Sequence, residues 1–449
     1  MPGTKWLIPL WLCTFCGLLI ADGLELPIYH AAPARLPGIS PEMNTPGFWI
    51  ARHPYPDSLI MQSFQIDKLN RYINKQGTVT KIWQHSTRMN GNTVRKQIKE
   101  MLTTLYDRGV YGFDGLPVPD SIKSLLHNNA AIDEIPASIK VRFAFPTSLA
   151  RQRFAPGHAN LNRLRGDTEF DEGQNSGEQT GSPLVLYHDS ADSLWVFGAS
   201  ATSSGWFLKS ELCIVPHSDW LACQNAETKV VCLEARSDLW LDEQATAYAG
   251  FCRMGASFPY LGEAGAYYRI LLFSGDGLKP GFIAKNVSGK GFLPFTPRNV
   301  YLQAFKLLNM PYGWGDTGSD FDCSSLLKSL FATFGIVLPR NGLQQVRALK
   351  DVVEFDSKAS PGFKHISLLK SAVPGLSLIR LNGHVMLYLG QLNGKAFALH
   401  NIWGYRSPGK DGKDEVYVIN RTVVSDLELG MGSQKGSLLS RITHFGEIR

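Results

Sequence analysis

The sequence predicts a multidomain α+β protein with an N-terminal helical segment, two small β-barrels and a C-terminal α+β domain. The chain has 449 residues, which is too long for one hydrophobic core, so several domains are expected. Short apolar strands alternate with turn residues between positions 138 and 290, a pattern typical of small barrels. Further along, an amphipathic helix is followed by a β-hairpin, which indicates a mixed α+β domain.

The chain begins with the features of a secretory signal peptide. An apolar stretch follows Lys5 and ends at the small residues Ala21-Asp22-Gly23. This stretch is shorter than the ~20 residues that span a bilayer, so we expect residues 1–23 to be removed on export across the inner membrane. The mature protein is then expected in the periplasm or cell envelope, without a stable membrane span. A lipoprotein signal at Cys16 is the alternative, although Phe15 is larger than the residue such signals prefer.

Apolar residues at helical spacing in 24–137 predict a helical domain, with helices near 59–73 and 97–106. We expect the two barrels at 138–217 and 218–290. Their strands are expected at 139–143, 183–188, 194–198, 205–208, 230–233, 267–273 and 281–284. Trp195 and Trp206 are expected in the barrel core, since aromatic side chains favour half-buried pleated positions. The alternative is that these two side chains line a cleft.

A cysteine stands where a helix of the C-terminal domain is expected to begin. Asp322 can cap this helix by accepting hydrogen bonds from its first free N–H groups. The positive end of the helix dipole then favours a thiolate on Cys323, which would make it a nucleophile. Gly335 is expected to end the helix, and one face is apolar, with Leu326, Leu327, Leu330, Phe331 and Phe334. A lone cysteine is more often a small core residue than a nucleophile. Assigning Cys323 as a nucleophile therefore requires a nearby base and a group that orients the base.

Two histidines on a predicted hairpin supply these partners. His384 opens one strand and His400 closes the return strand, so a base and a group that orients the base follow the cysteine. The two histidines face each other if the turn centres on Leu392. With a two-residue turn at Asn393-Gly394 they share a face only if a bulge intervenes. We predict one of these two registers.

Five segments in this order resemble the NlpC/P60 cysteine peptidases. They are PYGWG at 311–315, DCSS at 322–325, FGIVLPR at 334–340, GHVMLYLG at 383–390 and HNIWG at 400–404. The resemblance covers about residues 297–449 and implies a papain-like α+β domain, which we bound at 291–449. It also implies a murein hydrolase without a cofactor or metal, cutting the γ-D-glutamyl–diaminopimelate bond of peptidoglycan peptides. By position, it makes Cys323 the nucleophile, His384 the base and His400 the orienting residue.

The resemblance also implies residues that bind the substrate. Tyr312 matches a tyrosine that supports the oxyanion, and Asp322 matches an acid that holds the free amine of an N-terminal L-Ala. Ser324 follows the nucleophile and could offer a hydroxyl. Two positions depart from the family pattern: Gly342 stands where a substrate-binding serine is common, and Gly315-Asp316 replaces a common Gly-Gly.

The predicted barrels are similar, at 190–197 and 205–207, to the bacterial SH3 domains that accompany this peptidase. The implied arrangement is an N-terminal stabilising domain at 24–137, two SH3-like barrels and the peptidase. In this arrangement the first barrel closes one end of the catalytic cleft, so that only trimmed peptides with a free L-Ala amine fit. Tyr187 is the nearest candidate for the tyrosine of that wall.

Composition limits the candidate partners of the protein and the possible states of its cysteines. The chain carries 45 Lys+Arg and 39 Asp+Glu, a net charge of +6, without a run of basic residues interleaved with aromatics, so nucleic acid is a poor candidate partner. Cys323 is expected to be an unpaired thiol. The other cysteines after the signal form two disulfides or are buried thiols, and they are Cys213, Cys223, Cys232 and Cys252.

Two other functions fit the same residues. Cys323, His384 and His400 could ligate zinc, because thiolate and imidazole are good zinc ligands. The barrels could instead make this a wall-binding protein with a different amidase or acyltransferase activity. The oligomeric state stays open.

Overall fold

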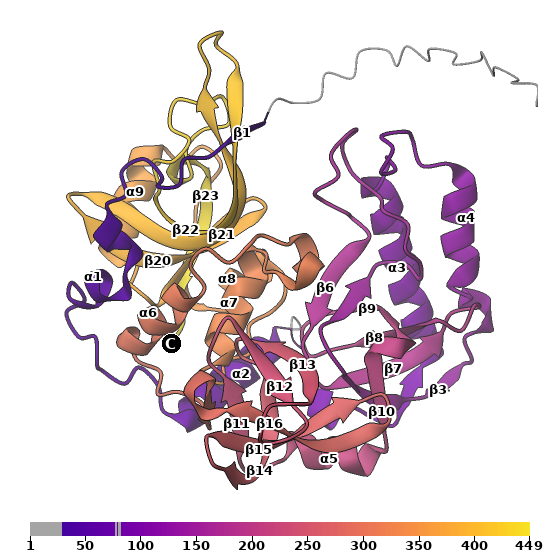
Figure 1. Ribbon diagram of the computed structural model, residues 1–449. Helices are drawn as coiled ribbons and strands as arrows, with labels where there is room; N and C mark the ends of the chain where they lie inside the picture. The colour runs from indigo at the N-terminus through magenta and orange to yellow at the C-terminus, as the bar shows by residue number, and fades with distance from the viewer. Residues whose placement is uncertain (1–28, 77–78, 80–81) are drawn as a thin grey trace, which may run out of the picture.

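The computed structural model describes residues 29–76, 79 and 82–449, and the predicted signal peptide at 1–23 lies outside them. The described chain is mixed α+β, with three seven-stranded sheets (Figure 1). No helix within these residues is long and apolar enough to cross a bilayer.

The C-terminal sheet has the strand order β1-β22-β21-β20-β19-β23-β18. Its strands are β1 (Tyr29–Ala31), β18 (Lys350–Glu354), β19 (Ser377–Leu381), β20 (His384–Leu392), β21 (Lys395–Pro408), β22 (Asp414–Asp426) and β23 (Ile442–Glu447). The helices of this region are α6 (Pro297–Lys306), α7 (Cys323–Ala332), α8 (Gly342–Arg347) and α9 (Pro361–Ser371). The chain therefore contributes its first described strand and its last strand to one sheet.

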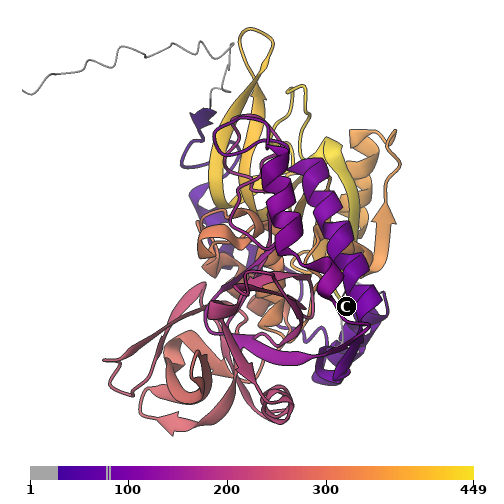
Figure 2. The ribbon, with the colours of Figure 1, turned by 90° about the vertical axis from the view of Figure 1, so that its right-hand side faces the viewer.

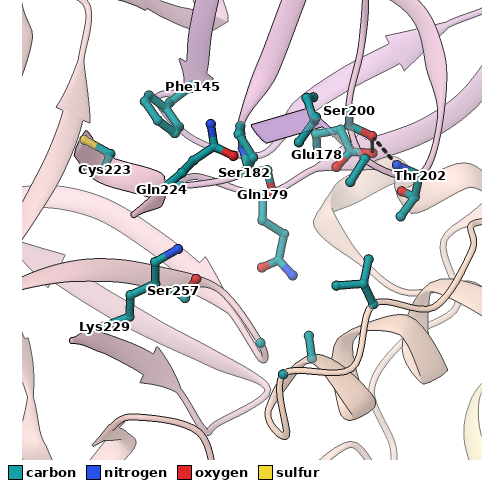
Figure 3. Close-up of a pocket in the computed structure, with 18 of the residues that line it drawn as sticks. Phe145, Glu178, Gln179, Ser182, Ser200, Thr202, Cys223, Gln224, Lys229 and Ser257 are labelled. Carbon is teal, nitrogen blue, oxygen red and sulfur yellow. Dashed lines mark hydrogen bonds between the residues drawn. The ribbon is translucent and has the colours of Figure 1, made fainter. Parts of the chain in front are cut away.

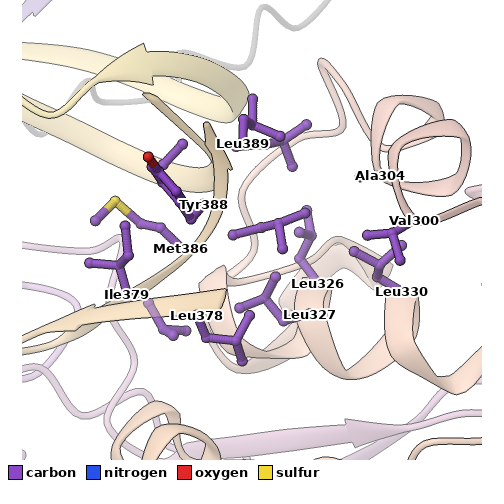
Figure 4. Packing of buried hydrophobic residues seen from close by; sticks show 14 of the residues in the cluster. Val300, Ala304, Leu326, Leu327, Leu330, Leu378, Ile379, Met386, Tyr388 and Leu389 are labelled. Carbon is purple, nitrogen blue, oxygen red and sulfur yellow. The ribbon is translucent and has the colours of Figure 1, made fainter. Parts of the chain in front are cut away.

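Helix α7 forms as its sequence predicts. Asp322 accepts hydrogen bonds from the backbone N–H groups of Ser324 and Ser325, at 3.1 and 2.9 Å, and so caps the helix. Gly335, just past the helix, has a φ of +78°, the left-handed conformation that glycine adopts without strain. The apolar face is buried against β20, β21 and α6 (Figure 4). Each large side chain buried there contributes about 1.5–3 kcal/mol, which holds the start of the helix in place.

The hairpin of β20 and β21 has the predicted bulge. Leu392 pairs with Lys395, so the turn is the two-residue Asn393-Gly394, with φ values of +50° and +75°. The register shifts between Tyr388 and Gly390, and beyond the shift Leu387 faces Leu399. This extra residue puts His384 and His400 on one face of the sheet, which a regular ladder from this turn would not do.

The middle of the chain forms two more sheets. The first has the order β10-β4-β7-β8-β9-β5-β6 and the second β13-β12-β16-β15-β14-β11-β17. The strands of the first are β4 (Arg142–Pro146), β5 (Ala150–Arg153), β6 (Gln174–Glu178), β7 (Leu184–Asp189), β8 (Trp195–Ala199), β9 (Ser204–Leu208) and β10 (Leu212–Val215). Those of the second are β11 (Lys229–Cys232), β12 (Arg236–Trp240), β13 (Tyr248–Arg253), β14 (Ser257–Ala264), β15 (Tyr267–Ser274), β16 (Gly277–Ala284) and β17 (Ser288–Lys290).

The strands expected from the sequence are present, but the closed SH3-like barrels are not supported. In the described residues the edge strands β10 and β6 do not pair with each other, nor do β13 and β17. A small hydrophobic cluster is made of first-sheet residues alone, whereas side chains of both sheets and of neighbouring helices share one larger cluster. Trp195 and Trp206 are in this core, 1% and 0% exposed, as predicted.

The region before the first sheet divides between two cores. Helices α1 (Pro46–Ile50) and α2 (Ser63–Lys75) bury side chains in the C-terminal core. Helices α3 (Gly91–Arg108) and α4 (Asp120–Asn129) instead join the core of the two middle sheets and lie on the outside of the molecule (Figure 2). The short strands β2 (Arg88–Asn90) and β3 (Ser138–Lys140) pair, and α5 (His217–Gln224) links the two middle sheets. The predicted domain boundaries stay a prediction.

Candidate active site

Cys323 and His384 line one groove, although 61 positions separate them in the chain. Cys323 is the first residue of α7, and His384 is the first residue of β20. The backbone N–H groups of Val385 and Ser324 lie within hydrogen-bonding reach of the Cys323 sulfur. Both side chains line a pocket of about 420 Å³, the cysteine pocket, whose walls also include Asp322, Ser324 and Arg340.

A chain of hydrogen bonds runs back from His384 into the sheet. Nε2 of His384 lies 2.7 Å from Nδ1 of His400, and Nε2 of His400 lies 2.9 Å from the Ser425 hydroxyl. If His384 Nε2–H donates to His400 and His400 Nε2–H donates to Ser425, Nδ1 of His384 is left with a lone pair for the thiol. Ser425 is on β22, and no sequence pattern distinguished it from the other alternating residues of that strand.

The sulfur and the imidazole are both neutral at rest. Burial, with the neighbouring Asp322 carboxylate, raises the pKa of the Cys323 thiol to about 12. Burial, with the charges of Arg441 and Lys435, lowers the pKa of His384 to about 3. The helix dipole favours the thiolate expected at the helix start, whereas burial and the Asp322 carboxylate favour the thiol.

Tyr312 lies in the same pocket as Cys323 and His384. Its ring lines the cysteine pocket, and its phenol lies close enough to Cys323 and Asp322 for their charges to act on it. Burial, helped by those two groups, raises the pKa of Tyr312 well above its usual value. The phenol therefore keeps its proton and is available as a hydrogen-bond donor beside the sulfur.

Asp322 is already paired with a cation. Arg340 donates hydrogen bonds to both carboxylate oxygens of Asp322, and its Nη1 lies 2.7 Å from the Ser324 hydroxyl. Burial alone would raise the pKa of Asp322, but the charge and hydrogen bonds of Arg340 lower it. A substrate ammonium at Asp322 must therefore share this carboxylate with Arg340. The sequence placed Arg340 in a family motif but indicated no role for it.

The other residues considered for substrate binding, Ser324 and Gly342, are closely surrounded by protein atoms, and so is Asp316. The Ser324 hydroxyl also donates to Asp322 at 3.1 Å, so both of its neighbours are protein groups. A Cβ at Gly342 would lie 3.2 Å from the side chain of Val385, which leaves little room for a serine there. Asp316, at the other departure from the family pattern, is 1% exposed with a φ of +69° and ion-pairs with Arg253.

Aromatic side chains from two regions meet beside His384. Phe170 lies in the loop between β5 and β6. Its ring centroid is 5.2 Å from the ring centroid of Trp314 and 5.5 Å from that of Trp403. The Trp314 indole donates to the backbone of Asp171 at 3.0 Å. Tyr187, the predicted wall residue, is not part of this surface: it is 7% exposed, and its hydroxyl lies 3.0 Å from His85 Nε2.

A separate cavity of about 460 Å³ lies between the two middle sheets and α7 (Figure 3). Its walls include Glu178, Gln179, Lys229 and Lys328, but none of Cys323, His384 or His400. Lys328 Nζ on α7 ion-pairs with the Glu178 carboxylate at 3.6 Å and donates a hydrogen bond to the Thr202 hydroxyl at 3.2 Å. This cavity therefore lies where the first middle sheet contacts the C-terminal region.

The five described cysteines are all free thiols, and those other than Cys323 are buried. Within the described residues, no group of three or more His, Cys, Asp or Glu side chains is arranged to hold a metal ion. His384 and His400 point a ring nitrogen at each other, so those two atoms are already engaged.

Comparisons with known proteins agree on the C-terminal region. Residues 309–404 match the NlpC/P60 family, and this range includes Cys323, His384 and His400. The chain is 33% identical over 116 residues to the bifunctional muramidase/DL-endopeptidase CwlT of Bacillus subtilis (strain 168), a match that spans 25% of this chain and 32% of that protein. This chain thus spans about a third of the length of that relative.

A solved structure extends the likeness in fold to nearly the whole chain. An NlpC/P60 endopeptidase from Photobacterium damselae subsp. piscicida superposes with a TM-score of 0.76 at 20% sequence identity, over 94% of this chain and 99% of its own. At this identity the likeness concerns the fold alone. The C-terminal part of the chain therefore contains an NlpC/P60 family domain, and its homologues include cell-wall hydrolases.

Proposed function

We propose that this protein is a cysteine endopeptidase that cleaves the γ-D-glutamyl–diaminopimelate bond of peptidoglycan peptides. The observation that carries the proposal is that Cys323 and His384 line one pocket, with the buried His400 and Ser425 hydrogen-bonded in series behind His384. A thiol, a base with a free lone pair and a group that orients the base are the parts that acyl transfer requires.

The reaction begins with the neutral pair. Cys323 gives its proton to His384 Nδ1 as its sulfur bonds to the γ-carbonyl carbon of D-Glu. The phenol of Tyr312 and the backbone N–H group of Cys323, at the start of α7, stabilise the oxyanion. His384 then protonates the leaving amine, and the C–N bond breaks to leave a thioester. A water molecule that gives a proton to His384 hydrolyses the thioester and restores the thiol.

We further propose that the substrate is a trimmed peptide with a free L-Ala amine. The cysteine pocket is bordered on one side by residues of the first sheet, including Glu172, Gln174 and Asn175, which limits the room for a glycan-linked stem. The acids that line this pocket are Asp322, which pairs with Arg340, and Glu172, which pairs with Arg163 at 2.8 Å, so an ammonium must share either carboxylate with an arginine. Such a substrate agrees with the proposed location in the periplasm or cell envelope.

The test is digestion of L-Ala-γ-D-Glu-meso-diaminopimelate and of intact sacculi, followed by mass spectrometry. The tripeptide should yield L-Ala-D-Glu and diaminopimelate, and sacculi should be cut far more slowly. Cys323→Ala and His384→Ala should each lower cleavage by at least about 10³-fold. His365→Ala, which changes a histidine on α9 outside the pocket, should leave it unchanged. Full activity in Cys323→Ala would refute the proposal, and binding to sacculi without cleavage would favour a wall-binding protein.

A further inference from the structure

The groove continues past His384 into a second pocket of about 400 Å³. We name it the cationic pocket, because three basic side chains line it: Arg406 of β21, Lys435 of the loop after β22, and Arg441 at the end of the 3-10 helix Leu439–Arg441. Its other walls include Asp167 and Phe170 from the first-sheet loop, with Tyr312 and Trp403.

The basic side chains of this pocket are short of acidic partners. Among the described residues neither Lys435 nor Arg441 forms an ion pair, and Arg406 has only Asp414, at 3.8 Å. Partial burial and then the charges of Arg441 and Arg406 lower the pKa of Lys435, so the cations act on one another. Three basic groups with Asp414 as the one acidic neighbour among the described residues on their side of the pocket leave an excess of positive charge there, which favours binding of an anion.

The opposite wall carries the opposite sign. Asp167 lines the pocket and forms no ion pair among the described residues. Its charge and that of Glu169 act on Tyr29, whose ring packs against Trp403 at 5.3 Å. A molecule that lies across this pocket thus meets basic groups on one side and an acid on the other.

The positions of the two reacting groups indicate which part of a substrate lies here. Cys323 lines the cysteine pocket but not the cationic pocket, whereas His384 lines both. After attack, the acyl group is bonded to sulfur, so it occupies the cysteine pocket. The leaving amine nitrogen lies within reach of the same Nδ1 of His384, and the rest of the leaving residue can extend past His384 into the cationic pocket, whose lining includes this histidine.

We propose that the cationic pocket is the subsite for the leaving diamino acid, with Lys435 and Arg441 binding its distal carboxylate and Asp167 its distal ammonium. This inference rests on the proposed function. Diaminopimelate carries a carboxylate and an ammonium at its distal end, whereas lysine carries only the ammonium. Charge-assisted hydrogen bonds to the second carboxylate therefore select diaminopimelate over lysine as the residue after D-Glu.

The experiment compares two peptides that differ only in that residue, L-Ala-γ-D-Glu-meso-diaminopimelate and L-Ala-γ-D-Glu-L-Lys. We expect the parent protein to cleave the first with at least a tenfold higher kcat/KM. Lys435→Gln and Arg441→Gln should each lower this ratio, and the double variant should bring it close to one. The loss should come from the diaminopimelate peptide, with cleavage of the lysine peptide kept.

The control is Lys410→Gln, which removes one positive charge from the exposed turn between β21 and β22, outside the pocket. It should leave the ratio unchanged. Equal cleavage of both peptides by the parent protein, or an unchanged ratio in the double variant, would overturn the subsite.

A binding measurement separates this inference from the proposed function. Calorimetric titration of the parent protein with free meso-diaminopimelate and with free L-lysine needs no catalysis. If neither peptide is cut but diaminopimelate alone binds, and the double variant loses that binding, the proposed reaction fails and the subsite stands. If neither amino acid binds and neither peptide is cut, both fail.

Discussion

At the scale of single residues, the main finding is that the proposed nucleophile rests as a thiol. Cys323 lies at a helix N-terminus, which favours a thiolate, but burial and the Asp322 carboxylate act in the opposite direction and prevail. His384 is neutral as well, since burial lowers its pKa. The proton therefore moves when substrate binds, and no preformed ion pair is needed.

This state predicts how Cys323 reacts with iodoacetamide. Because its pKa is raised to about 12, the thiolate fraction should rise tenfold for each pH unit between 6 and 9. The inactivation rate should follow the same slope, measured as residual cleavage, with labelling of Cys323→Ala as the background. A rate that is flat below pH 7 would instead show a thiolate paired with a protonated histidine.

Ser425 is predicted to act as a positioning residue. Ser425→Ala leaves the buried Nε2–H of His400 without its acceptor, at a cost of about 1–3 kcal/mol in unfolding free energy. We expect kcat to fall about tenfold with KM nearly unchanged, a small part of what general acid–base catalysis contributes. Ser425→Thr keeps the hydroxyl and should restore kcat, which a purely structural role would not require.

At the scale of secondary structure, one carboxylate serves two elements. Asp322 caps α7 and also holds Arg340 from the segment before α8. It thereby fixes the start of the helix relative to the pocket wall, and its charge raises the pKa of Cys323.

Asp322→Asn separates these roles. Asparagine caps a helix as well as aspartate does, so α7 should persist. The lost charge should lower the pKa of Cys323 and make alkylation several-fold faster at fixed pH. Breaking a buried ion pair should lower the unfolding free energy by about 3–5 kcal/mol, measured by urea denaturation. Asp320→Asn, two positions away, is the control, and equal alkylation rates in the two variants would contradict the argument.

At the scale of the whole molecule, three regions meet at Asp316. Its carboxylate accepts a hydrogen bond from the Gly177 backbone of the first sheet at 3.0 Å. It ion-pairs with Arg253 of the second sheet at 3.0 Å and with Arg340 at 3.5 Å. The departure from Gly-Gly in the family pattern is thus the residue that ties the two middle sheets to the pocket wall.

Asp316→Ala should therefore weaken the contacts between the two middle sheets and the wall of the cysteine pocket. It leaves Arg253, 3% exposed, without its carboxylate, and we expect a loss of about 3–5 kcal/mol in unfolding free energy together with weaker cleavage. Arg253→Met combined with Asp316→Ala should recover part of this stability. Asp57→Ala breaks an exposed ion pair with Arg298 and should barely move the urea midpoint. A similar midpoint for Asp57→Ala and Asp316→Ala would refute the role of the junction.

Local chemistry made much of the C-terminal region predictable. The spacing of Leu326, Leu327 and Leu330 predicts the buried face of α7, and the turn at Asn393-Gly394 requires the bulge that aligns the two histidines. These features depend on neighbours a few residues apart, so the sequence is enough to find them.

Other features were decided by residues distant in the chain. The sequence shows that strands exist at 138–290 but not that their sheets share a hydrophobic cluster instead of closing, because closure depends on pairing between edge strands. The raised pKa of Cys323 depends on the partial burial of its side chain and on the nearby Asp322 carboxylate, which only the folded chain defines. By contrast, the sequence by itself determined the order in which the proposed thiol, base and orienting group occur along the chain. Only the tertiary structure gathered Lys435, Arg441 and Asp167 around one pocket, since long-range packing sets which charges share a space.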